Sequence, residues 1–205
     1  MPTKDAVTPL LLETIRIEEG QIANLSYHQA RCDKSRQTLF HTAKPLELSS
    51  IIDPPKIGLY RCRILYAEAL HSIEYIPYTP KTIETLKIIP SEIEYNFKYA
   101  NRDGLNALLE ANKDVDEVII EKEGCLTDTT ISNIAFFDGK QWFTPDTPLL
   151  EGTMRAKLIE EGLLQTKKIR KEALSNYSQV ALINAMIGFK ILNIDTIQNI
   201  QEGRE

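Results

Sequence analysis

Lys98 stands between Phe97 and Tyr99, just before a predicted helix, in a segment that reads NFKYANRDGLN over residues 96–106. An amine buried beside aromatic side chains is less inclined to carry its charge, and a neutral amine is the form that makes a Schiff base with an aldehyde. Most lysines, however, are solvated. The segment alone therefore leaves two interpretations of Lys98 open, an ordinary surface lysine or a reactive amine kept in a pocket.

Three arginines and one histidine have spacings that suit anion binding. His28 and Arg31 lie three residues apart on a predicted helix, so they share a face of it. A guanidinium offers forked donors to a phosphate, but a solvated helix face is the plainer interpretation. Arg61 and Arg63 alternate with Cys62 and therefore point to one face of a predicted strand, where a solvent-facing surface is slightly favoured.

Asp128 and Gly152 mark two further candidate positions. Asp128 precedes two threonines in CLTDTTISN and suits a turn, which is the usual role of an aspartate in such a segment. Gly152 stands at the start of a predicted helix whose first N–H groups belong to Thr153 and Met154. Helix N-termini bind anions through these N–H groups and the helix dipole. Every helix has such an end, so this signal is weak by itself.

Apolar periodicity and turn residues predict the elements that must position these side chains. Two short runs around Gly20 predict a hairpin, after which Ser26 is expected to cap a helix that runs to about Phe40. The pair Asp138-Gly139 between two aromatic-rich runs favours a type I′ hairpin turn. Further strands are predicted within 57–70, 72–79, 116–124 and 179–184, and helices from Asp103 and over 153–161. Residues 81–94 are extended and punctuated by proline, as a linker or an edge strand would be.

The order of these elements predicts an α+β or α/β protein in two lobes. We expect an N-terminal α/β domain over residues 1–85, a linker over 86–95 and a C-terminal domain over 96–205. With 205 residues, of which 42% are hydrophobic, the chain is long enough for one medium domain or two small ones with a real core.

Composition also excludes several classes of partner and site. The net charge of −5, without a basic stripe, gives little support to a nucleic-acid partner. The first residues hold only a short apolar run, so we expect neither a secretory leader nor a membrane-spanning helix, and a cytoplasmic location. Three cysteines far apart in sequence, with no C-x-x-C pair, predict reduced thiols and no zinc or other metal site.

The motifs taken in order resemble the class IV family of pyridoxal-phosphate aminotransferases and lyases. The resemblance rests on LLETIRIEEGQIANLSYHQAR, KYANR, EVIIEKEGCLTDTTISNIAFF and WFTPDTPLLEGTMR, and it spans roughly residues 11–190. Each motif is weak, whereas the ordered set is quite specific. The resemblance implies the fold of a fold-type IV pyridoxal-phosphate enzyme, with a small N-terminal α/β domain, a β-rich pseudo-barrel that binds the cofactor, and a homodimer as the usual assembly.

The resemblance also implies a role for each candidate residue. Lys98 would hold pyridoxal 5′-phosphate as a Schiff base and move the substrate proton. Asp128 stands where the family commonly has glutamate, whose carboxylate pairs with the pyridine nitrogen and keeps the ring protonated, so that the ring takes up the electron pair of a broken bond.

The cofactor phosphate has its own set of residues in the same resemblance. Arg31 would hold it, together with the N–H groups of Thr153 and Met154 and the turn at Asn184 and Ala185.

The segments ALINAMIGFKIL and GTMR are similar to stretches of aminodeoxychorismate lyases, an activity of folate biosynthesis. The leading hypothesis is therefore a lyase that converts 4-amino-4-deoxychorismate into 4-aminobenzoate and pyruvate, with Arg61 or Arg63 meeting the substrate carboxylates. An amino-acid aminotransferase, of the branched-chain or a similar type, would use the same Lys98. A third hypothesis is a shortened, non-enzymatic relative that serves as a binding or assembly module.

Overall fold

The computed structural model describes residues 8–41 and 44–198, and these form two compact units. Unit 1 holds the described residues up to Tyr78 together with Phe97–Asn101. Unit 2 holds Thr79–Asn96 and the described residues from Arg102 onward. Within the two described ranges, no helix is long and apolar enough to cross a membrane.

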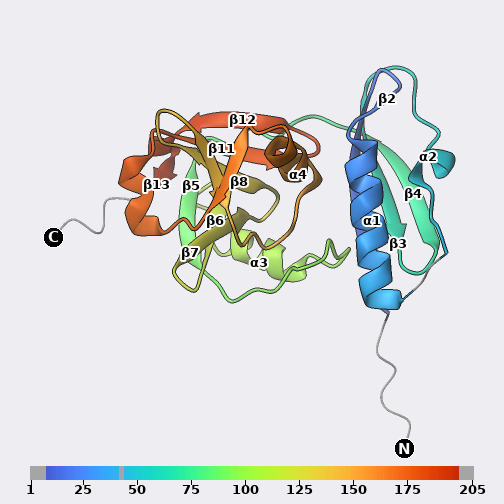
Figure 1. The fold of residues 1–205 in the computed structure, drawn as a ribbon, viewed down its shortest axis with the longest axis horizontal. Coiled ribbons are helices and arrows are strands. Elements are labelled where there is room, and N and C mark those ends of the chain that lie inside the picture. Colours follow the sequence, from blue (N-terminus) through green and yellow to red (C-terminus); the bar gives the residue numbers. More distant parts are fainter. Residues whose placement is uncertain (1–7, 42–43, 199–205) are drawn as a thin grey trace, which may run out of the picture. The chain divides into compact units, whose positions relative to one another are not determined.

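Unit 1 is a four-stranded antiparallel sheet with α1 packed on one face (Figure 1). The strand order is β2-β1-β3-β4. Alternate residues of β1, which reads LLETIRIE, are fully buried on the side of the helix. The elements are β1 (Leu11–Glu18), β2 (Gln21–Ile22), α1 (Leu25–Phe40), α2 (Leu48–Ile51), β3 (Leu59–Tyr66) and β4 (Leu70–Pro77).

Unit 2 is a larger sheet with a core of aliphatic and aromatic side chains. Its strands run in the order β10-β9-β8-β7-β6-β5-β13, and β11 pairs with both β8 and β12. The strands are β5 (Leu86–Pro90), β6 (Glu117–Lys122), β7 (Cys125–Thr129), β8 (Asn133–Phe137), β9 (Trp142–Pro145), β10 (Leu164–Lys167), β11 (Gln179–Asn184), β12 (Gly188–Asn193) and β13 (Ile197–Gln198). The helical elements are α3 (Asp103–Glu110), α4 (Thr153–Glu160), η1 (Lys171–Asn176) and η2 (Ile194–Thr196).

The predicted linker over residues 86–95 is not a linker in the structure. Its first part is β5, which lies between β6 and β13 with parallel pairing on both sides. Pro90 ends the strand, so the missing proline N–H does not interrupt the ladder. The division of the chain also differs from the predicted domains, because residues 97–101 pair with the start of β1 and so belong to unit 1. The predicted domain ends at 1–7 and 199–205 lie outside the described residues.

Two local predictions need correction. Helix α1 begins at Leu25 after Asn24, whose backbone is left-handed, so Ser26 lies inside the first turn and is not the cap. The β8–β9 hairpin is confirmed, but its turn is not type I′, since that turn needs positive φ at both central residues and Asp138 lacks it. Instead the Asp138 carboxylate accepts hydrogen bonds from the backbone N–H groups of Lys140 and Gln141.

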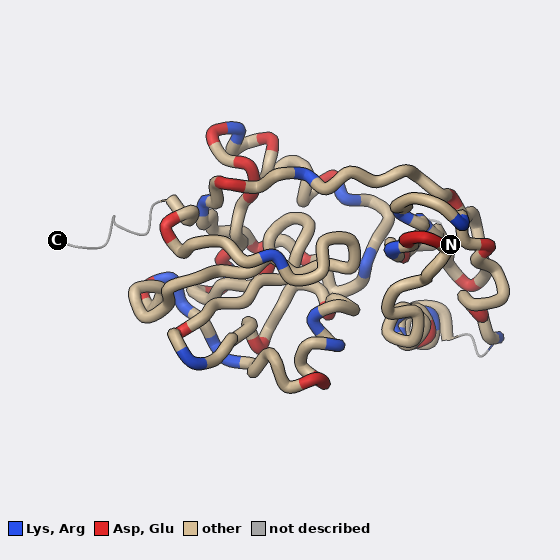
Figure 2. Tube along the Cα trace, turned by 90° about the horizontal axis from the view of Figure 1, so that it is seen from above, with Lys and Arg blue, Asp and Glu red and all other residues tan. Residues whose placement is uncertain are grey.

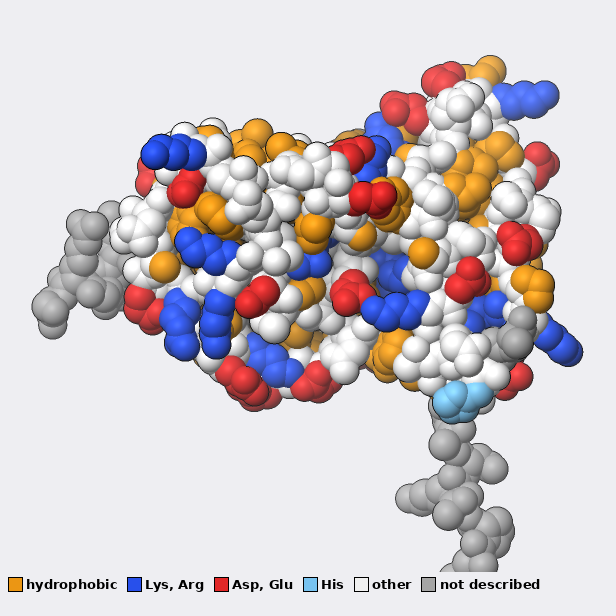
Figure 3. Space-filling view, viewed as in Figure 1, with side chains coloured by type: hydrophobic (Ala, Val, Ile, Leu, Met, Phe, Trp, Pro, Cys, Tyr) orange, Lys and Arg blue, Asp and Glu red, His pale blue; other side chains and the backbone are white. Residues whose placement is uncertain are grey.

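Charged residues of both signs are interspersed along the chain (Figure 2). On the face shown in Figure 3, lysine and arginine side chains alternate with acidic ones and are not gathered into a basic patch.

Candidate functional site

A buried carboxylate organises the polar cluster of unit 1. Glu13 lies on the helix-facing side of β1 and is 0% exposed. Arg31 donates two hydrogen bonds to the Glu13 carboxylate, from Nε to Oε1 at 2.9 Å and from Nη2 to Oε2 at 2.5 Å. His28 Nδ1 lies 2.6 Å from the same Oε2. The spacing of three residues on α1 therefore points both side chains at Glu13, as the shared helix face predicts.

The charges of this cluster are set by burial and by its two cations. Burial raises the pKa of Glu13, but the charge of Arg31 and the hydrogen bonds from His28 and Arg31 outweigh burial and hold that pKa at about 2. Burial lowers the pKa of His28, Glu13 opposes this effect, and the positive charges of Arg31 and Lys98 reinforce it. Glu13 is thus ionised, and His28 is a neutral ring that donates its Nδ1 proton to Glu13.

Lys98 belongs to the same unit and is half-buried. Its carbonyl accepts a hydrogen bond from the Leu12 N–H at 2.8 Å, and the next residue, Tyr99, pairs with Leu11. The segment that carries Lys98 is therefore fixed beside the start of β1, one residue from Glu13. Lys98 also acts electrostatically on His28. The structure thus brings Lys98 and Arg31 into one cluster.

Arg61 and Arg63 lie on the opposite face of the four-stranded sheet from Glu13. In the β1–β3 register Glu13 faces Ile64, whereas Arg63 faces Thr14 and Arg61 faces Arg16. Arg63 donates to Glu74 at 3.1 Å. The Nε atom of Arg61 is buried and has no hydrogen-bond partner among the described residues. The predicted strand face is confirmed, and Arg61 is its more unusual member because it holds an unsatisfied buried donor.

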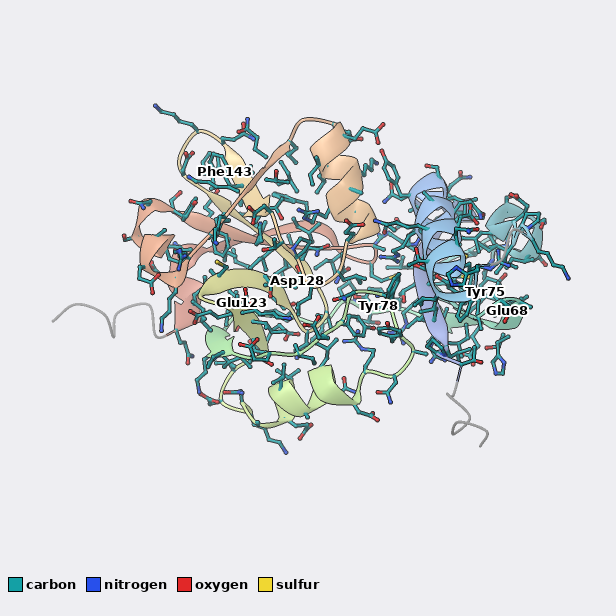
Figure 4. All side chains as sticks on the ribbon, turned by 60° about the horizontal axis from the view of Figure 1, so that its bottom comes forward. Glu68, Tyr75, Tyr78, Glu123, Asp128 and Phe143 are labelled. Atoms are coloured by element: carbon teal, nitrogen blue, oxygen red, sulfur yellow. The ribbon has the colours of Figure 1, made fainter. Side chains whose placement is uncertain are left out.

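Asp128 is the central acid of unit 2 (Figure 4). It is the last residue but one of β7 and is 4% exposed. Its Oδ1 accepts from Asn133 Nδ2 at 2.8 Å, and its Oδ2 accepts from the Leu150 N–H at 2.9 Å. Burial raises the pKa of Asp128 to about 7, although these hydrogen bonds and the nearby charge of Arg155 pull it down. The carboxylate therefore sits where a cationic neighbour would keep it ionised.

Asn133 joins Asp128 to the start of α4. Besides its bond to Asp128, Asn133 Nδ2 donates to the Leu150 carbonyl at 2.8 Å. Its Oδ1 lies so close to Gly152 that a Cβ there would be only 1.9 Å away. Glycine at position 152 is thus required by this approach, not by an unusual backbone angle, since its φ is −73°. The first turn of α4, which begins at Thr153, is held against the Asp128 carboxylate.

The predicted turn at Asn184 and Ala185 joins the same group. Asn184 Nδ2 donates to Ser132 Oγ at 3.0 Å and to the Ile131 carbonyl at 3.3 Å. Its Oδ1 accepts from the N–H groups of Met186 and Ile187 and so closes the turn. The predicted residues that unit 2 brings together are Asp128, Thr153, Met154, Asn184 and Ala185.

Sequence reasoning missed the polar residues that hold these candidates in place. Glu13 and Asn133 stood inside the quoted motifs, but neither received a role. Glu117, which is 0% exposed and binds Thr130, was also missed. A signal existed for Glu13 and Glu117, because each acid occupies a position of a predicted strand where alternation or an apolar run places a core residue. For Asn133 no such signal existed.

Comparison with known proteins gives consistent matches. The amino-transferase class IV family model matches residues 63–194. An uncharacterized protein of Haemophilus influenzae strain Rd is 40% identical over 184 residues, which are 87% of this chain and 98% of that protein. A crystal structure from Haemophilus somnus 129PT, described as a candidate 4-amino-4-deoxychorismate lyase, has 40% identity and a TM-score of 0.82, with 88% of this chain and 97% of that chain covered.

A more distant structure shows the likeness of fold alone. It is the pyridoxal-phosphate-bound form of a hypothetical aminotransferase from Mycobacterium tuberculosis, with a TM-score of 0.75 at 15% identity. The match covers 100% of this chain and 89% of that chain.

Proposed function

Because the chain belongs to the class IV amino-transferase family and has the fold of fold-type IV pyridoxal-phosphate enzymes, we propose that it is a pyridoxal-phosphate-dependent 4-amino-4-deoxychorismate lyase. Members of this family typically bind pyridoxal phosphate. The observation that carries the choice of reaction is the similarity, over nearly the full length of both chains, to the Haemophilus somnus protein described as such a lyase. The proposed products are 4-aminobenzoate and pyruvate.

The polar residues of the two units match the groups of pyridoxal phosphate. In unit 1, Lys98 would supply an amine for the aldehyde carbon, and Arg31 would supply forked donors for the phosphate. In unit 2, the N-terminus of α4 is a second candidate for binding the phosphate. Asp128 supplies a buried carboxylate for the pyridine nitrogen. When bound, this cofactor supplies an electron sink for the pair left when a bond at the substrate carbon breaks.

In this proposal Asp128 holds a proton on the ring nitrogen. Its raised pKa shows that burial alone disfavours the charged carboxylate, so a cationic N–H placed beside it is strongly favoured over a neutral nitrogen. The hydrogen bonds from Asn133 and Leu150 fix the direction of the carboxylate. Aspartate has a shorter side chain than the glutamate that is usual in the family, so β7, which carries Asp128 and is not the turn that the sequence suggested, would have to lie closer to the ring.

Arg31 binds the phosphate as a preoriented donor. Glu13 accepts hydrogen bonds from its Nε and Nη2 atoms, which fixes the plane of the guanidinium. The ion pair also limits the net positive charge that unit 1 must bury. His28 stays neutral beside it and adds no further cation.

Lys98 carries the proton in the proposed reaction. Its Nζ takes the proton from the substrate carbon that bears the amino group. The bond between the adjacent ring carbon and the enolpyruvyl oxygen then breaks, which makes the ring aromatic. The group that leaves is the enolate of pyruvate, and it takes up a proton at its methylene carbon to give pyruvate. Lys98 is half-buried and is flanked in the sequence by Phe97 and Tyr99, whose rings contact each other edge to face.

Arg61 is the proposed partner of a substrate carboxylate. The substrate carries two carboxylates, and a buried guanidinium N–H without an acceptor is a costly feature that an anion would relieve. Arg63 already has Glu74 as an acceptor and is the second candidate.

An amino-acid aminotransferase is the alternative, and the match to the class IV amino-transferase family model favours it. The same Lys98, Arg31 and Asp128 would serve this reaction. The two activities differ in their products, since transamination releases a 2-oxo acid and leaves the amino group on the cofactor.

The two activities are separated by a product assay on the purified protein loaded with pyridoxal phosphate. Incubation with 4-amino-4-deoxychorismate should release pyruvate and 4-aminobenzoate in equal amounts, and Lys98→Ala should release neither above the uncatalysed rate. Pyruvate formation no faster than with Lys98→Ala would contradict the lyase. Conversion of the cofactor to its amine form by added amino acids, with no pyruvate from aminodeoxychorismate, would establish the alternative instead.

A further inference from the structure

Arg102 makes two contacts that bracket the segment with Lys98. Its Nη2 donates to the Thr130 carbonyl at 2.7 Å, and its guanidinium carbon lies 5.9 Å from the centre of the Tyr95 ring. Its own carbonyl accepts from the Asn106 N–H at 2.8 Å, so Arg102 is also the residue from which α3 starts. Tyr95, Arg102 and Thr130 all belong to unit 2.

Thr130 is itself held firmly from the other side. Glu117, at the start of β6 and 0% exposed, accepts from Thr130 Oγ1 at 2.8 Å and from the Thr130 N–H at 3.3 Å. Glu117 also accepts from the Val118 N–H at 2.9 Å, which fixes the carboxylate. Glu117 and Arg102 therefore bind different atoms of Thr130, since Glu117 accepts from its hydroxyl and N–H and Arg102 donates to its carbonyl. Thr130 lies two residues after Asp128.

The Arg102–Tyr95 contact closes the base of a short loop. The chain leaves unit 2 after Asn96, the residue that follows Tyr95, and returns to it at Arg102, and Lys98 lies between these points. A cation over an aromatic ring and a hydrogen bond from a charged donor are both stabilising where the groups are withdrawn from water. The two ends of the Lys98 loop are thus fastened to each other and to the turn that follows Asp128.

We propose that Arg102 is a positioning residue for Lys98, which ties the base of the 96–101 loop to the 129–132 turn through Thr130. Arg102 acts through the backbone and touches no reacting atom in this role. The proposal rests on the proposed function only in treating Lys98 as the reacting amine, since the contacts themselves exist in the protein without cofactor.

Amide hydrogen exchange of the cofactor-free protein, followed by mass spectrometry, tests the tie directly. Arg102→Gln should speed exchange about tenfold in peptides that cover 96–101 and also in peptides that cover 129–132, a factor equal to about 1.4 kcal/mol. Arg102→Lys keeps a donor for Thr130 but loses the planar contact with Tyr95, so it should show a smaller increase in both segments. Arg170→Gln, an equal charge change at an exposed arginine of unit 2, is the control and should leave both segments unchanged.

A second measurement uses borohydride to trap pyridoxal phosphate on Lys98 at increasing cofactor concentration. Arg102→Gln should need about tenfold more cofactor for half-maximal trapping than the Arg170→Gln control, with Arg102→Lys between the two. Exchange that is unchanged, raised in only one of the two segments, or raised throughout unit 2 overturns the proposal. Should Arg102→Gln not fold, the same criteria apply to Arg102→Lys. A wild-type protein that traps no cofactor refutes the proposed function but leaves the exchange result valid.

Discussion

The substitution Gly152→Ala tests how the start of α4 is joined to Asp128. The new Cβ would lie 1.9 Å from Asn133 Oδ1 and 3.1 Å from Asn133 Cγ, so the amide side chain has to move. The backbone angle is not the obstacle, because φ at position 152 is −73°, which alanine adopts freely. The substitution therefore acts through a steric clash with one side chain, that of Asn133.

The cost follows from the hydrogen bonds that Asn133 loses when it moves. Its Nδ2 donates to Asp128 and to the Leu150 carbonyl, both at 2.8 Å. A neutral hydrogen bond contributes about 0.5–1.5 kcal/mol and one to a charged group about 1.5–3 kcal/mol, which gives a loss of roughly 2–4.5 kcal/mol. Alanine lowers the entropy of the unfolded chain, which offsets about 0.4–1 kcal/mol. The expected net loss in the free energy of unfolding is about 1–4 kcal/mol.

Urea unfolding of the cofactor-free protein measures this loss in a double-mutant cycle. In an Asn133→Ala background the clashing atoms are absent, so Gly152→Ala should cost nothing or stabilise slightly. Gly104→Ala is the matched control, because its Cβ would meet only the flexible end of Ile93 at 3.0 Å and alanine favours the helix α3. An equal cost of Gly152→Ala in the wild-type and Asn133→Ala backgrounds would refute the steric account.

Three further predictions concern the buried acids Glu13 and Asp128 and the sheet face that carries Arg61 and Arg63. The pKa of Glu13 is held at about 2, below its ordinary 4.5, so ionised Glu13 stabilises the fold above pH 4.5 and this stabilisation is lost as the pH falls. Between pH 5 and pH 3 the free energy of unfolding of wild type should therefore drop about 2 kcal/mol more than that of Glu13→Gln. An equal drop in the two proteins would contradict a stabilising ion pair. The pKa of Asp128 is raised from 3.8 to about 7, so the cofactor-free wild type should lose stability as the pH rises through that range while Asp128→Asn does not; parallel urea midpoints for the two proteins would refute this. In the lyase assay Arg61→Gln should raise KM about tenfold or more with little change in kcat, which is the loss expected for one charged hydrogen bond. Arg63→Gln should raise KM less, because Arg63 already pairs with Glu74. A larger effect of Arg63→Gln would place the substrate carboxylate at Arg63 instead.

The parts of the fold that sequence predicted are those fixed by local patterns. The hairpin at Gly20, the helices α3 and α4, and the strand β11 are all confirmed, because alternation, helical spacing and turn glycines act over a few residues. The stretch that holds β5 was interpreted as a linker or an edge strand, and the domain division took it as a linker. The stability of β5 comes from β6 and β13, which are distant in sequence. Pairing of the Lys98 segment with β1 is equally non-local and could not be derived from either segment.

The candidate site divides in the same way. The shared helix face of His28 and Arg31 follows from their spacing, and the structure confirms it. Their common target, Glu13, could not be assigned from sequence, since a buried acid is recognised only once its partners are known. Gly152 was read as a helix start, whereas the reason for glycine at that position is the side chain of Asn133, a contact between residues 19 positions apart.

The attachment of pyridoxal phosphate to Lys98 is the central claim, and one measurement tests it most directly. The purified protein is mixed with pyridoxal phosphate, reduced with borohydride, digested and mapped by mass spectrometry, with Lys98→Ala treated in parallel. The account predicts a phosphopyridoxyl group on Lys98 of the wild type, together with a yellow absorbance before reduction, and neither feature in Lys98→Ala. A wild-type protein that stays colourless and carries no such group on Lys98, or carries it equally on other lysines, would contradict the account.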